Sequence, residues 1–377
     1  MRESSAAVED PPALRCRDCG TLVDVASLLV TCPCGGLFDL ADRIPAAGVA
    51  PVDETRNSLW RYASVLPVDV DDRISLGEGM TPLVPSRDMP NVRFKLDLLL
   101  PTLSFKDRGA VVLATLARTL GVESALTDSS GNAGTAAAAY LGRARIPCRV
   151  FVPESTSPVK LAQMRAYGAE VVTVRGSRAD TATAARRAAA QPGVFYASHV
   201  YHPYFIHGVK TFGYELWEQN GRRLPEVVVV PVGNGTLLLG AHLAFRELVE
   251  AGWASGMPTI VAVQARGCAP VAEAFALGSD TVTSSTGTEP TVAEGIAISH
   301  PPRGAQILAA VRDTGGTVVS VSDEQILRAR ADLAHQGLYV EPTSAVCWAA
   351  VLAGAAGGLL NTAEVVVPLC GAGAKSP

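Results

Sequence analysis

The chain has 377 residues, of which 48% are hydrophobic and 18% are charged, and its net charge is −4 at pH 7. This composition is sufficient for a buried core and about two domains, and it excludes an intrinsically disordered protein. With 32 basic against 36 acidic residues and only 6% aromatic residues, we expect no binding to nucleic acid, which needs excess positive charge or stacking surfaces.

The sequence contains no segment that indicates secretion or membrane insertion. Residues 1–12 are acidic and lack the apolar core of a signal peptide. Residues 342–363 are uncharged but contain Pro342 and Asn361, which favours a buried helix over a transmembrane one. We therefore expect no membrane association and a cytoplasmic protein.

The first motif along the chain is a set of four cysteines within residues 13–40. It reads Cys-x2-Cys followed twelve residues later by Cys-x-Cys, and comprises Cys16, Cys19, Cys32 and Cys34. Two close thiol pairs can complete a tetrahedral zinc site, which would be structural because no coordination position stays open. An unmetallated ribbon of the same shape, or a redox pair, is the alternative.

From residue 76 onward, short apolar segments alternate with Ala-rich segments of helical pattern, after a stretch that contains one short helix at 59–65. We predict strands at 125–127, 149–152, 170–174, 227–232, 259–264, 317–321 and 365–369. We predict helices at 107–120, 134–144, 158–167, 179–190, 210–219, 237–248, 323–335 and 343–353. This alternation predicts an α/β fold with parallel sheets, whose uninterrupted apolar strands are covered by helices on both faces.

A lysine stands at the start of the first predicted long helix. Residues 104–109 read Ser-Phe-Lys-Asp-Arg-Gly and follow a helix-breaking proline, Pro101. The positive end of a helix disfavours the ammonium form of Lys106, which makes the amine a better nucleophile toward an aldehyde cofactor. Taken alone, a lysine at a helix start is more often simply solvated.

Three further motifs follow predicted strands. Residues 128–134 (Asp-Ser-Ser-Gly-Asn-Ala-Gly) offer consecutive N–H groups and hydroxyls that suit a carboxylate, and Asn132 can donate to a phenolate oxygen. Residues 233–236 (Gly-Asn-Gly-Thr) join an apolar strand to a helix and suit a small phosphate ester. Cys370 follows the last strand, where side chains reach a crevice. Ordinary strand-to-helix turns and a buried structural thiol are the alternatives.

Together, an activated lysine, an amide loop, a phosphate cradle and a strand-end thiol fit one cofactor, pyridoxal phosphate. From about residue 14 onward the chain resembles the fold-type II pyridoxal-phosphate enzymes, and most of all the threonine synthase family. The segments that carry this resemblance are 32–36, 76–83, 104–109, 129–134, 233–236, 340–345 and 371–375.

The resemblance implies a role for each motif. Lys106 would form the Schiff base with the cofactor and move protons on the substrate, and Phe105 would pack near the cofactor ring. Asn132 would hold the ring oxygen, and Cys370 would face the ring nitrogen. The cofactor phosphate would be held by Gly233, Asn234, Gly235 and Thr236. The substrate amino acid would be held by Ser129, Ser130, Gly131 and Ala133, with Lys160 as a contributor at its phosphate and Arg108 as an additional candidate there.

The resemblance also implies an architecture. We expect a zinc-ribbon-like segment at 13–40, an arm and the start of the large domain at 41–100, a small α/β domain at 101–205, and a large domain that binds the cofactor phosphate at 206–377. The cofactor would lie between the two α/β domains, and substrate would close the smaller one. Members of the family are commonly homodimers, so we expect one here.

Some residues depart from the family pattern. Leu100 and Leu103 replace Asn and Gly before the lysine, and residues 197–211 lack an Asn, an Arg and a Gln of the family while carrying His199, His202 and His207. These histidines either read a different substrate group or are solvated or packed in a loop.

Three functions are therefore compatible with the sequence. The first is elimination of phosphate from O-phosphohomoserine followed by addition of water, which gives threonine. The second is β-elimination or β-replacement on another amino acid, which the departures and residues 293–298 favour. The third is a catalytically silent scaffold.

Overall fold

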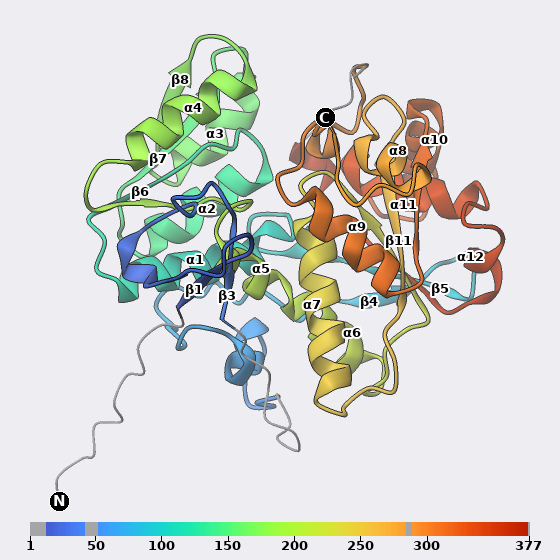
Figure 1. Cartoon of the computed structure of the whole chain (residues 1–377). Coiled ribbons are helices and arrows are strands. Elements are labelled where there is room, and N and C mark those ends of the chain that lie inside the picture. Colours follow the sequence, from blue (N-terminus) through green and yellow to red (C-terminus); the bar gives the residue numbers. More distant parts are fainter. Residues whose placement is uncertain (1–12, 42–51, 284–288, 376–377) are drawn as a thin grey trace, which may run out of the picture.

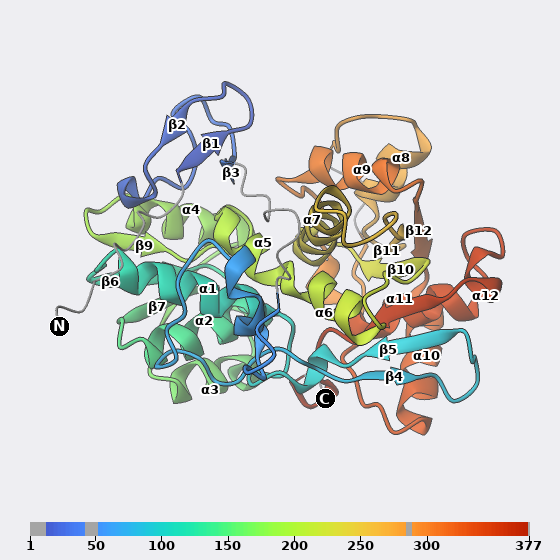
Figure 2. The ribbon, with the colours of Figure 1, turned by 90° about the horizontal axis from the view of Figure 1, so that it is seen from below.

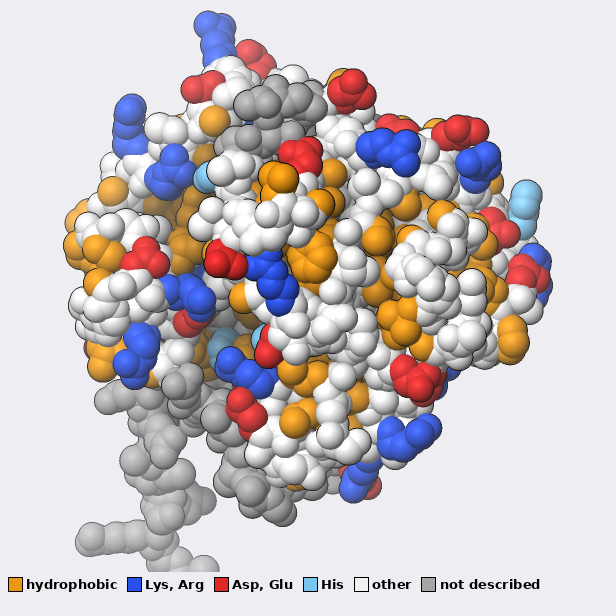
Figure 3. All heavy atoms as spheres, turned by 45° about the vertical axis from the view of Figure 1, so that its right-hand side comes forward, with side chains coloured by type: hydrophobic (Ala, Val, Ile, Leu, Met, Phe, Trp, Pro, Cys, Tyr) orange, Lys and Arg blue, Asp and Glu red, His pale blue; other side chains and the backbone are white. Residues whose placement is uncertain are grey.

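The computed structural model describes residues 13–41, 52–283 and 289–375, without the side chains of Val159 and Lys160. Figure 1 shows two lobes side by side, with a small N-terminal ribbon against one of them. No helix among these residues has the length and apolarity to cross a membrane. On the face seen in Figure 3, basic and acidic side chains are interspersed.

The ribbon is a three-stranded antiparallel sheet of order β2-β1-β3. Its strands are β1 (Leu14–Cys16), β2 (Leu22–Val23) and β3 (Phe38–Leu40), with a short 3-10 helix, η1 (Val25–Ser27), between the last two. Figure 2 shows the ribbon above the smaller lobe. The predicted short helix at 59–65 is present as the 3-10 helix η2 (Leu59–Val65).

The smaller lobe contains a parallel sheet of order β8-β7-β6-β9. Its strands are β6 (Ser124–Thr127), β7 (Cys148–Pro153), β8 (Glu170–Val174) and β9 (Val194–Tyr196). The helices that accompany it are α1 (Lys106–Thr119), α2 (Asn132–Arg143), α3 (Pro158–Ala166), α4 (Arg178–Ala189) and α5 (Pro203–Val209). Strand–helix alternation with parallel pairing is the arrangement that the sequence predicts.

The larger lobe contains a six-stranded sheet of order β12-β11-β10-β13-β5-β4 that is parallel except for β4. Its strands are β4 (Leu83–Pro85), β5 (Val92–Lys95), β10 (Val227–Pro231), β11 (Thr259–Ala265), β12 (Thr317–Val321) and β13 (Val365–Pro368). Its helices are α6 (Thr211–Gln219), α7 (Thr236–Glu250), α8 (Pro270–Ala276), α9 (Gly304–Asp313), α10 (Asp323–His335), α11 (Pro342–Leu352) and α12 (Leu359–Thr362). Helix α11 is buried, as its uncharged sequence predicts.

Two sequence expectations need correction. The strands are not apolar and buried throughout, because the edge strands β8 and β12 are largely half-exposed. The sequence patterns also miss several elements that the structure contains, namely strands β4, β5 and β9 and helices α5, α8, α9 and α12. Strand β5 carries Arg93 and Lys95 and is only four residues long, so its pattern does not indicate a buried strand.

The chain leaves the larger sheet after β5, builds the smaller sheet, and returns through α5. Helix α1 lies just after the first of these crossings and helix α5 forms the second. The two helices pack closely against each other. A Cβ atom on Gly208 would lie 2.2 Å from the carbonyl oxygen of Arg108, and one on Gly109 would lie 2.5 Å from the ring of Phe205. A glycine on each helix therefore allows the two backbones to touch.

A group of four buried charges lies beneath the start of α1. The guanidinium of Arg108 donates to both carboxylate oxygens of Asp97, at 2.9 and 2.7 Å, and to both of Glu215, at 2.5 and 2.9 Å. Lys95 Nζ donates to Glu215 Oε2 at 2.6 Å. All four side chains are fully buried, so the network ties β5 and α6 to the helix that begins at Lys106.

Candidate active site

A cavity of about 970 Å³ opens between the two lobes at the carboxyl ends of β6 and β10. Ligands of open parallel α/β sheets bind in this position. The cavity brings together residues that the sequence spreads over the whole chain: Phe105, Lys106, Ser129, Ser130, Gly131, Asn132, Ala133, Gly233, Asn234, Gly235, Thr236 and Cys370. All of the residues that the sequence predicts to bind the cofactor therefore line this cavity.

Lys106 is the first residue of α1 and lines this cavity. Desolvation lowers the pKa of its amine to about 8, against the opposing charges of Cys370 and Glu341. Burial rather than the helix end is thus the leading cause of its activation. Its Nζ donates to Thr236 Oγ1 at 3.2 Å and lies 4.1 Å from the ring centroid of Phe105. At neutral pH a useful fraction of this amine is unprotonated and nucleophilic.

The loop between β6 and α2 forms the wall of the cavity on the side of the smaller lobe. Helix α2 starts at Asn132, so the loop residues present the N-terminal end of a helix to the cavity. A Cβ atom on Gly134 would lie 1.8 Å from the carbonyl oxygen of Ser129. The loop can therefore close this tightly only because residue 134 is glycine.

Asn132 has a partner that the sequence analysis did not identify. Its Nδ2 donates to both carboxylate oxygens of Glu341, at 3.1 and 3.0 Å. Glu341 precedes α11 in the larger lobe and is almost completely buried. Its carboxylate therefore holds the Asn132 amide and joins the two lobes across the cavity.

The turn after β10 has the geometry of a phosphate cradle. Gly235 adopts the left-handed conformation at φ 75° immediately before α7, a helix of 15 residues. A Cβ atom on Gly233 would lie 2.8 Å from the Cα of Ile296. Close packing against Ile296 therefore requires a glycine at 233, and the turn lies at the N-terminus of a long helix, which favours a phosphate group.

Cys370 lies directly after β13 and is buried in the floor of the cavity. Burial raises the pKa of its thiol well above the usual value, so the sulfur is a neutral donor or acceptor. The carbonyl of Cys370 accepts the N–H of Phe105 at 2.9 Å. This bond connects the strand-end thiol to the residue that precedes the lysine.

Leu103, which stands where the resembled family has glycine, keeps a glycine-like backbone. Its φ is 65°, in the left-handed region that costs a residue with a side chain about 1–2 kcal/mol. The Leu103 side chain also lines the cavity. The substitution therefore preserves the turn before Lys106 and adds an apolar group to the cavity wall.

Other predicted residues have different outcomes. Lys160 lies in α3 and its side chain is outside the described part of the chain, so its role remains a prediction. Arg108 as a candidate for a phosphate contact is wrong, because it is buried and bonded to Asp97 and Glu215. His199 lines the cavity and is buried, and His202 and His207 are packed rather than solvated.

Several cavity residues were not predicted, namely Glu341, Arg178, Arg330 and Lys375. Two of them lie in segments that carry the family resemblance: Glu341 in 340–345 and Lys375 in 371–375. Lys375 Nζ donates to the carbonyl of Thr102 at 2.7 Å, beside the turn that leads to Lys106. Arg178 and Arg330 sit on polar helices with no sequence signal that distinguishes them from surface arginines.

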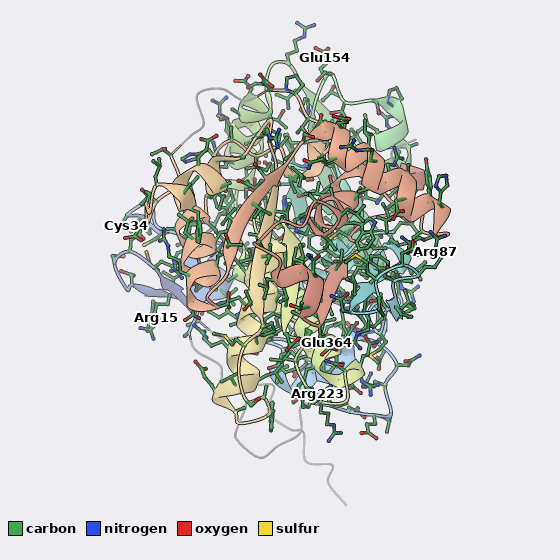
Figure 4. All side chains as sticks on the ribbon, turned by 90° about the vertical axis from the view of Figure 1, so that its right-hand side faces the viewer. Arg15, Cys34, Arg87, Glu154, Arg223 and Glu364 are labelled. Carbon is green, nitrogen blue, oxygen red and sulfur yellow. The ribbon has the colours of Figure 1, made fainter. Side chains whose placement is uncertain are left out.

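The four cysteines of the ribbon converge. The sulfur atoms of Cys16, Cys19, Cys32 and Cys34 all lie within 4.8 Å of one another, and none is in a disulfide. Four sulfurs at this spacing match the ligand set of a tetrahedral zinc site. Figure 4 shows Cys34 at the edge of the molecule, so the cluster has no direct part in the cavity.

Comparison with known proteins is consistent with this geometry. The family described as "Pyridoxal-phosphate dependent enzyme" matches residues 74–371. The chain belongs to this family. It is 32% identical to the threonine synthase of Methanosarcina acetivorans over 94% of this chain and 89% of that protein, and 32% identical to the threonine synthase of Methanocaldococcus jannaschii over 96% and 93%.

Solved structures of the family share the fold. A threonine deaminase from T.th. superimposes with a TM-score of 0.65 at 29% identity, covering 78% of this chain and 92% of that one. Maize serine racemase, at 22% identity, has a TM-score of 0.67 over 78% and 88%. The fold is therefore that of the fold-type II pyridoxal-phosphate enzymes.

The cavity residues fit this family's cofactor. A partly desolvated lysine amine suits the aldehyde, and the Gly233–Thr236 turn suits the phosphate. The Asn132 amide lies in the same cavity and would donate to the ring oxygen once turned from Glu341. A neutral thiol at Cys370 suits an unprotonated ring nitrogen.

Proposed function

We propose that this protein is a threonine synthase, which releases phosphate from O-phosphohomoserine and adds water at the β carbon to give threonine. The observation that carries the proposal is the similarity to two threonine synthases over 94–96% of the chain. That similarity extends beyond the family segment at 74–371. The cavity supports it by combining a nucleophilic amine with two separate anion-binding turns.

Each cavity residue has a proposed task. Lys106 would attach the cofactor, and its free amine would move protons at the α and β carbons of the substrate. Thr236 orients that amine through the 3.2 Å hydrogen bond. When bound, pyridoxal phosphate supplies an electron sink for negative charge at the α carbon. Cys370 would leave the ring nitrogen unprotonated, and the cofactor would then be a milder electron sink, which suits elimination and replacement.

The remaining residues position substrate and cofactor. The N–H groups and hydroxyls of Ser129, Ser130, Gly131 and Ala133 hold the substrate α-carboxylate. The 233–236 turn holds the cofactor phosphate, and Phe105 packs beside the ring. Lys160 remains a proposed contributor at the substrate phosphate.

A second candidate is β-elimination or β-replacement on another amino acid. Its support is the 29% identity with a threonine deaminase structure and the Leu103 side chain in the cavity wall. This enzyme would release a 2-oxoacid, or exchange a β substituent, without producing threonine. The cofactor and Lys106 would serve both reactions in the same way.

The deciding experiment supplies cofactor-loaded protein with O-phosphohomoserine and measures phosphate and threonine together. Phosphate with an equal amount of threonine supports the proposal. Phosphate with a 2-oxoacid in place of threonine would refute the proposal, because phosphate is then lost from the γ carbon without addition of water at the β carbon. A yellow protein that releases neither phosphate nor threonine, but forms a 2-oxoacid from serine or threonine, refutes the first candidate and supports the second. A protein that stays colourless with added pyridoxal phosphate would instead indicate the silent scaffold.

Zinc in the ribbon is a separate proposal. Its support is the convergence of four sulfurs at Cys16, Cys19, Cys32 and Cys34. We expect about one zinc ion per chain by elemental analysis. The metal should be lost in Cys19→Ser and retained in the control Cys268→Ser, where the thiol lies outside the cluster. Metal content that Cys19→Ser leaves unchanged would refute the site.

We also propose the domain division at 101–205 and 206–377, closure of the first onto the second, and a homodimer in the cytoplasm. Closure predicts that a substrate analogue protects the protein from proteolysis, and equal cleavage with and without it would count against closure. Sedimentation analysis tests the dimer.

A further inference from the structure

Besides Lys106, the basic side chains that line the cavity are Arg178, Arg330 and Lys375 among the described residues. Two of these donate hydrogen bonds to neighbouring groups of the chain. Lys375 Nζ donates to the carbonyl of Thr102 at 2.7 Å, and Arg330 donates to the carbonyl of Val340 at 2.9 Å and to the hydroxyl of Tyr339 at 3.2 Å. Arg178 also has a partner, Asp128, but it bonds to it through one terminal nitrogen and is half exposed, so it is the basic residue best able to receive a ligand.

Arg178 is the first residue of α4, and its side chain is half exposed. One terminal nitrogen donates to Asp128 Oδ2 at 2.7 Å. Asp128 immediately precedes the 129–133 loop, so this bond places the guanidinium beside the proposed carboxylate site. A guanidinium has five N–H donors in a planar fork, and further donors are available for an oxyanion.

His199 lies close to Arg178 and is the most unusual polar residue of the cavity. It is about nine-tenths buried, and its Nδ1 has no hydrogen-bond partner among the described residues. Burial, assisted by the charges of Lys106 and Arg178, lowers its pKa well below the usual value. The ring is thus a neutral group that retains one N–H donor, and a buried unpaired nitrogen of this kind is costly.

The described part of the chain encloses this nitrogen and offers it no partner. His199 also borders a second cavity of about 10 Å³, whose remaining lining side chains, such as Leu113, Leu141 and Phe205, are all apolar. A water molecule there would lack the two to four polar neighbours that buried water requires. Because Nδ1 is enclosed and has no acceptor for a proton, the ring proton belongs on Nε2, the nitrogen that is not enclosed and can donate to a molecule in the main cavity.

We propose that Arg178 and His199 form the subsite for an anionic group at the side-chain end of the substrate, separate from the 233–236 cradle. For the proposed function, on which the choice of ligand rests, that group is the phosphate of O-phosphohomoserine. The subsite supplies a fixed positive charge and a neutral N–H donor from α4 and from the 197–211 segment. That segment lacks the family's arginine, and the Arg178 side chain replaces its charge from another element.

The test uses the cofactor-loaded protein and two non-reactive probes that share the amino-acid end. One is the phosphonate analogue of O-phosphohomoserine, and the other carries a methyl group in place of the phosphonate. Binding of each is followed through the visible spectrum of the cofactor. The variants are Arg178→Gln, His199→Phe and His199→Asn, in which the amide restores an N–H donor.

Two variants serve as controls. Arg187→Gln removes an exposed arginine from the same helix, and His202→Asn changes a histidine of the same loop that is also buried with an unpaired Nδ1 but does not line the cavity. Neither variant should alter binding of the phosphonate by more than about 2-fold, because neither side chain lines the cavity that would hold the ligand.

We expect Arg178→Gln and His199→Phe to weaken phosphonate binding by about 10-fold or more, as loss of a charge-assisted hydrogen bond does. The methyl probe should change by less than about 2-fold, and His199→Asn should recover part of the loss. Equal weakening of both probes would assign these residues to the α-carboxylate and overturn the subsite. Unchanged binding of both would also overturn it.

The outcome is separable from that of the proposed function. If the wild-type protein releases no phosphate from O-phosphohomoserine yet binds the phosphonate in an Arg178-dependent manner, the function fails and the anion subsite stands. If the wild-type protein makes threonine but Arg178→Gln and His199→Phe keep the wild-type KM and kcat, the function stands and the subsite fails. A wild-type protein that binds both probes equally also refutes the subsite.

Discussion

Replacement of Glu215 by glutamine tests the buried charge network under α1. Burial alone would raise the pKa of Glu215, but Arg108 and Lys95 outweigh it and lower the pKa from 4.5 to about 2. A difference of about 2.5 pKa units at about 1.36 kcal/mol per unit corresponds to about 3 kcal/mol of stability. The variant leaves two buried cations with Asp97 as the one remaining carboxylate of the network, and breaking a buried pair of this kind costs about 3–5 kcal/mol.

Urea unfolding of Glu215→Gln and wild-type protein, followed by circular dichroism at pH 7, measures this difference. The matched control is Glu250→Gln, because Glu250 pairs with Arg246 at 3.6 Å on the exposed face of α7 and should change stability by less than about 0.5 kcal/mol. If Glu215→Gln destabilises the protein no more than Glu250→Gln does, the network does not stabilise the fold as argued.

The same network sets a pH dependence with a definite sign. The folded pKa of Glu215 is below its unfolded value, so its contribution is complete above about pH 4.5 and is lost as pH falls toward about 2. Glu215→Gln should therefore differ most from the wild type at neutral pH and least near pH 2. A gap that stays constant across this range would contradict the assignment.

Three further changes test the site. Lys106→Ala should abolish the visible absorbance of bound cofactor and leave the circular dichroism unchanged. The control Lys375→Ala should retain the absorbance. The opposite pattern would assign the attachment of the cofactor to Lys375. Burial raises the pKa of Asp107 to about 7. The wild type should therefore lose stability relative to Asp107→Asn as pH rises from about 4 to 7. A stability difference between the two proteins that is the same at both pH values would refute this. Gly134→Ala should displace the carbonyl of Ser129 and raise KM for the amino-acid substrate by about 10-fold or more, with unchanged kinetics as the contrary result.

Much of the fold follows from the sequence because long strands and helices carry their own pattern. Strands β8 and β12 and helix α10 begin and end at the predicted residues. Strand β5 could not be predicted in the same way. Its Lys95 is charged but fully buried, and only the distant Glu215 makes that position tolerable. Local patterns do not show a partner 120 residues away.

The site was predictable where it depends on backbone. The turns at 129–134 and 233–236 and the lysine at 106 are contiguous motifs, and the structure brings all three to one cavity. Glu341 and His199 were harder to assign, because their importance arises from what folding places opposite them. A buried imidazole nitrogen without a partner can be recognised only once the surrounding side chains are in place.

The glycine contact between α1 and α5 has a mechanical consequence. The chain passes between the two lobes twice, once just before Lys106 and once at α5. A body held at two points rotates about the line that connects them, and atoms near that line travel least. If the smaller lobe closes as proposed, the close contact at Gly109 and Gly208 lies at this axis, and Lys106 should stay aligned with the 233–236 turn while the 129–133 loop moves with the lobe. The proposed attachment point of the cofactor would then move less than the loop proposed to bind the substrate.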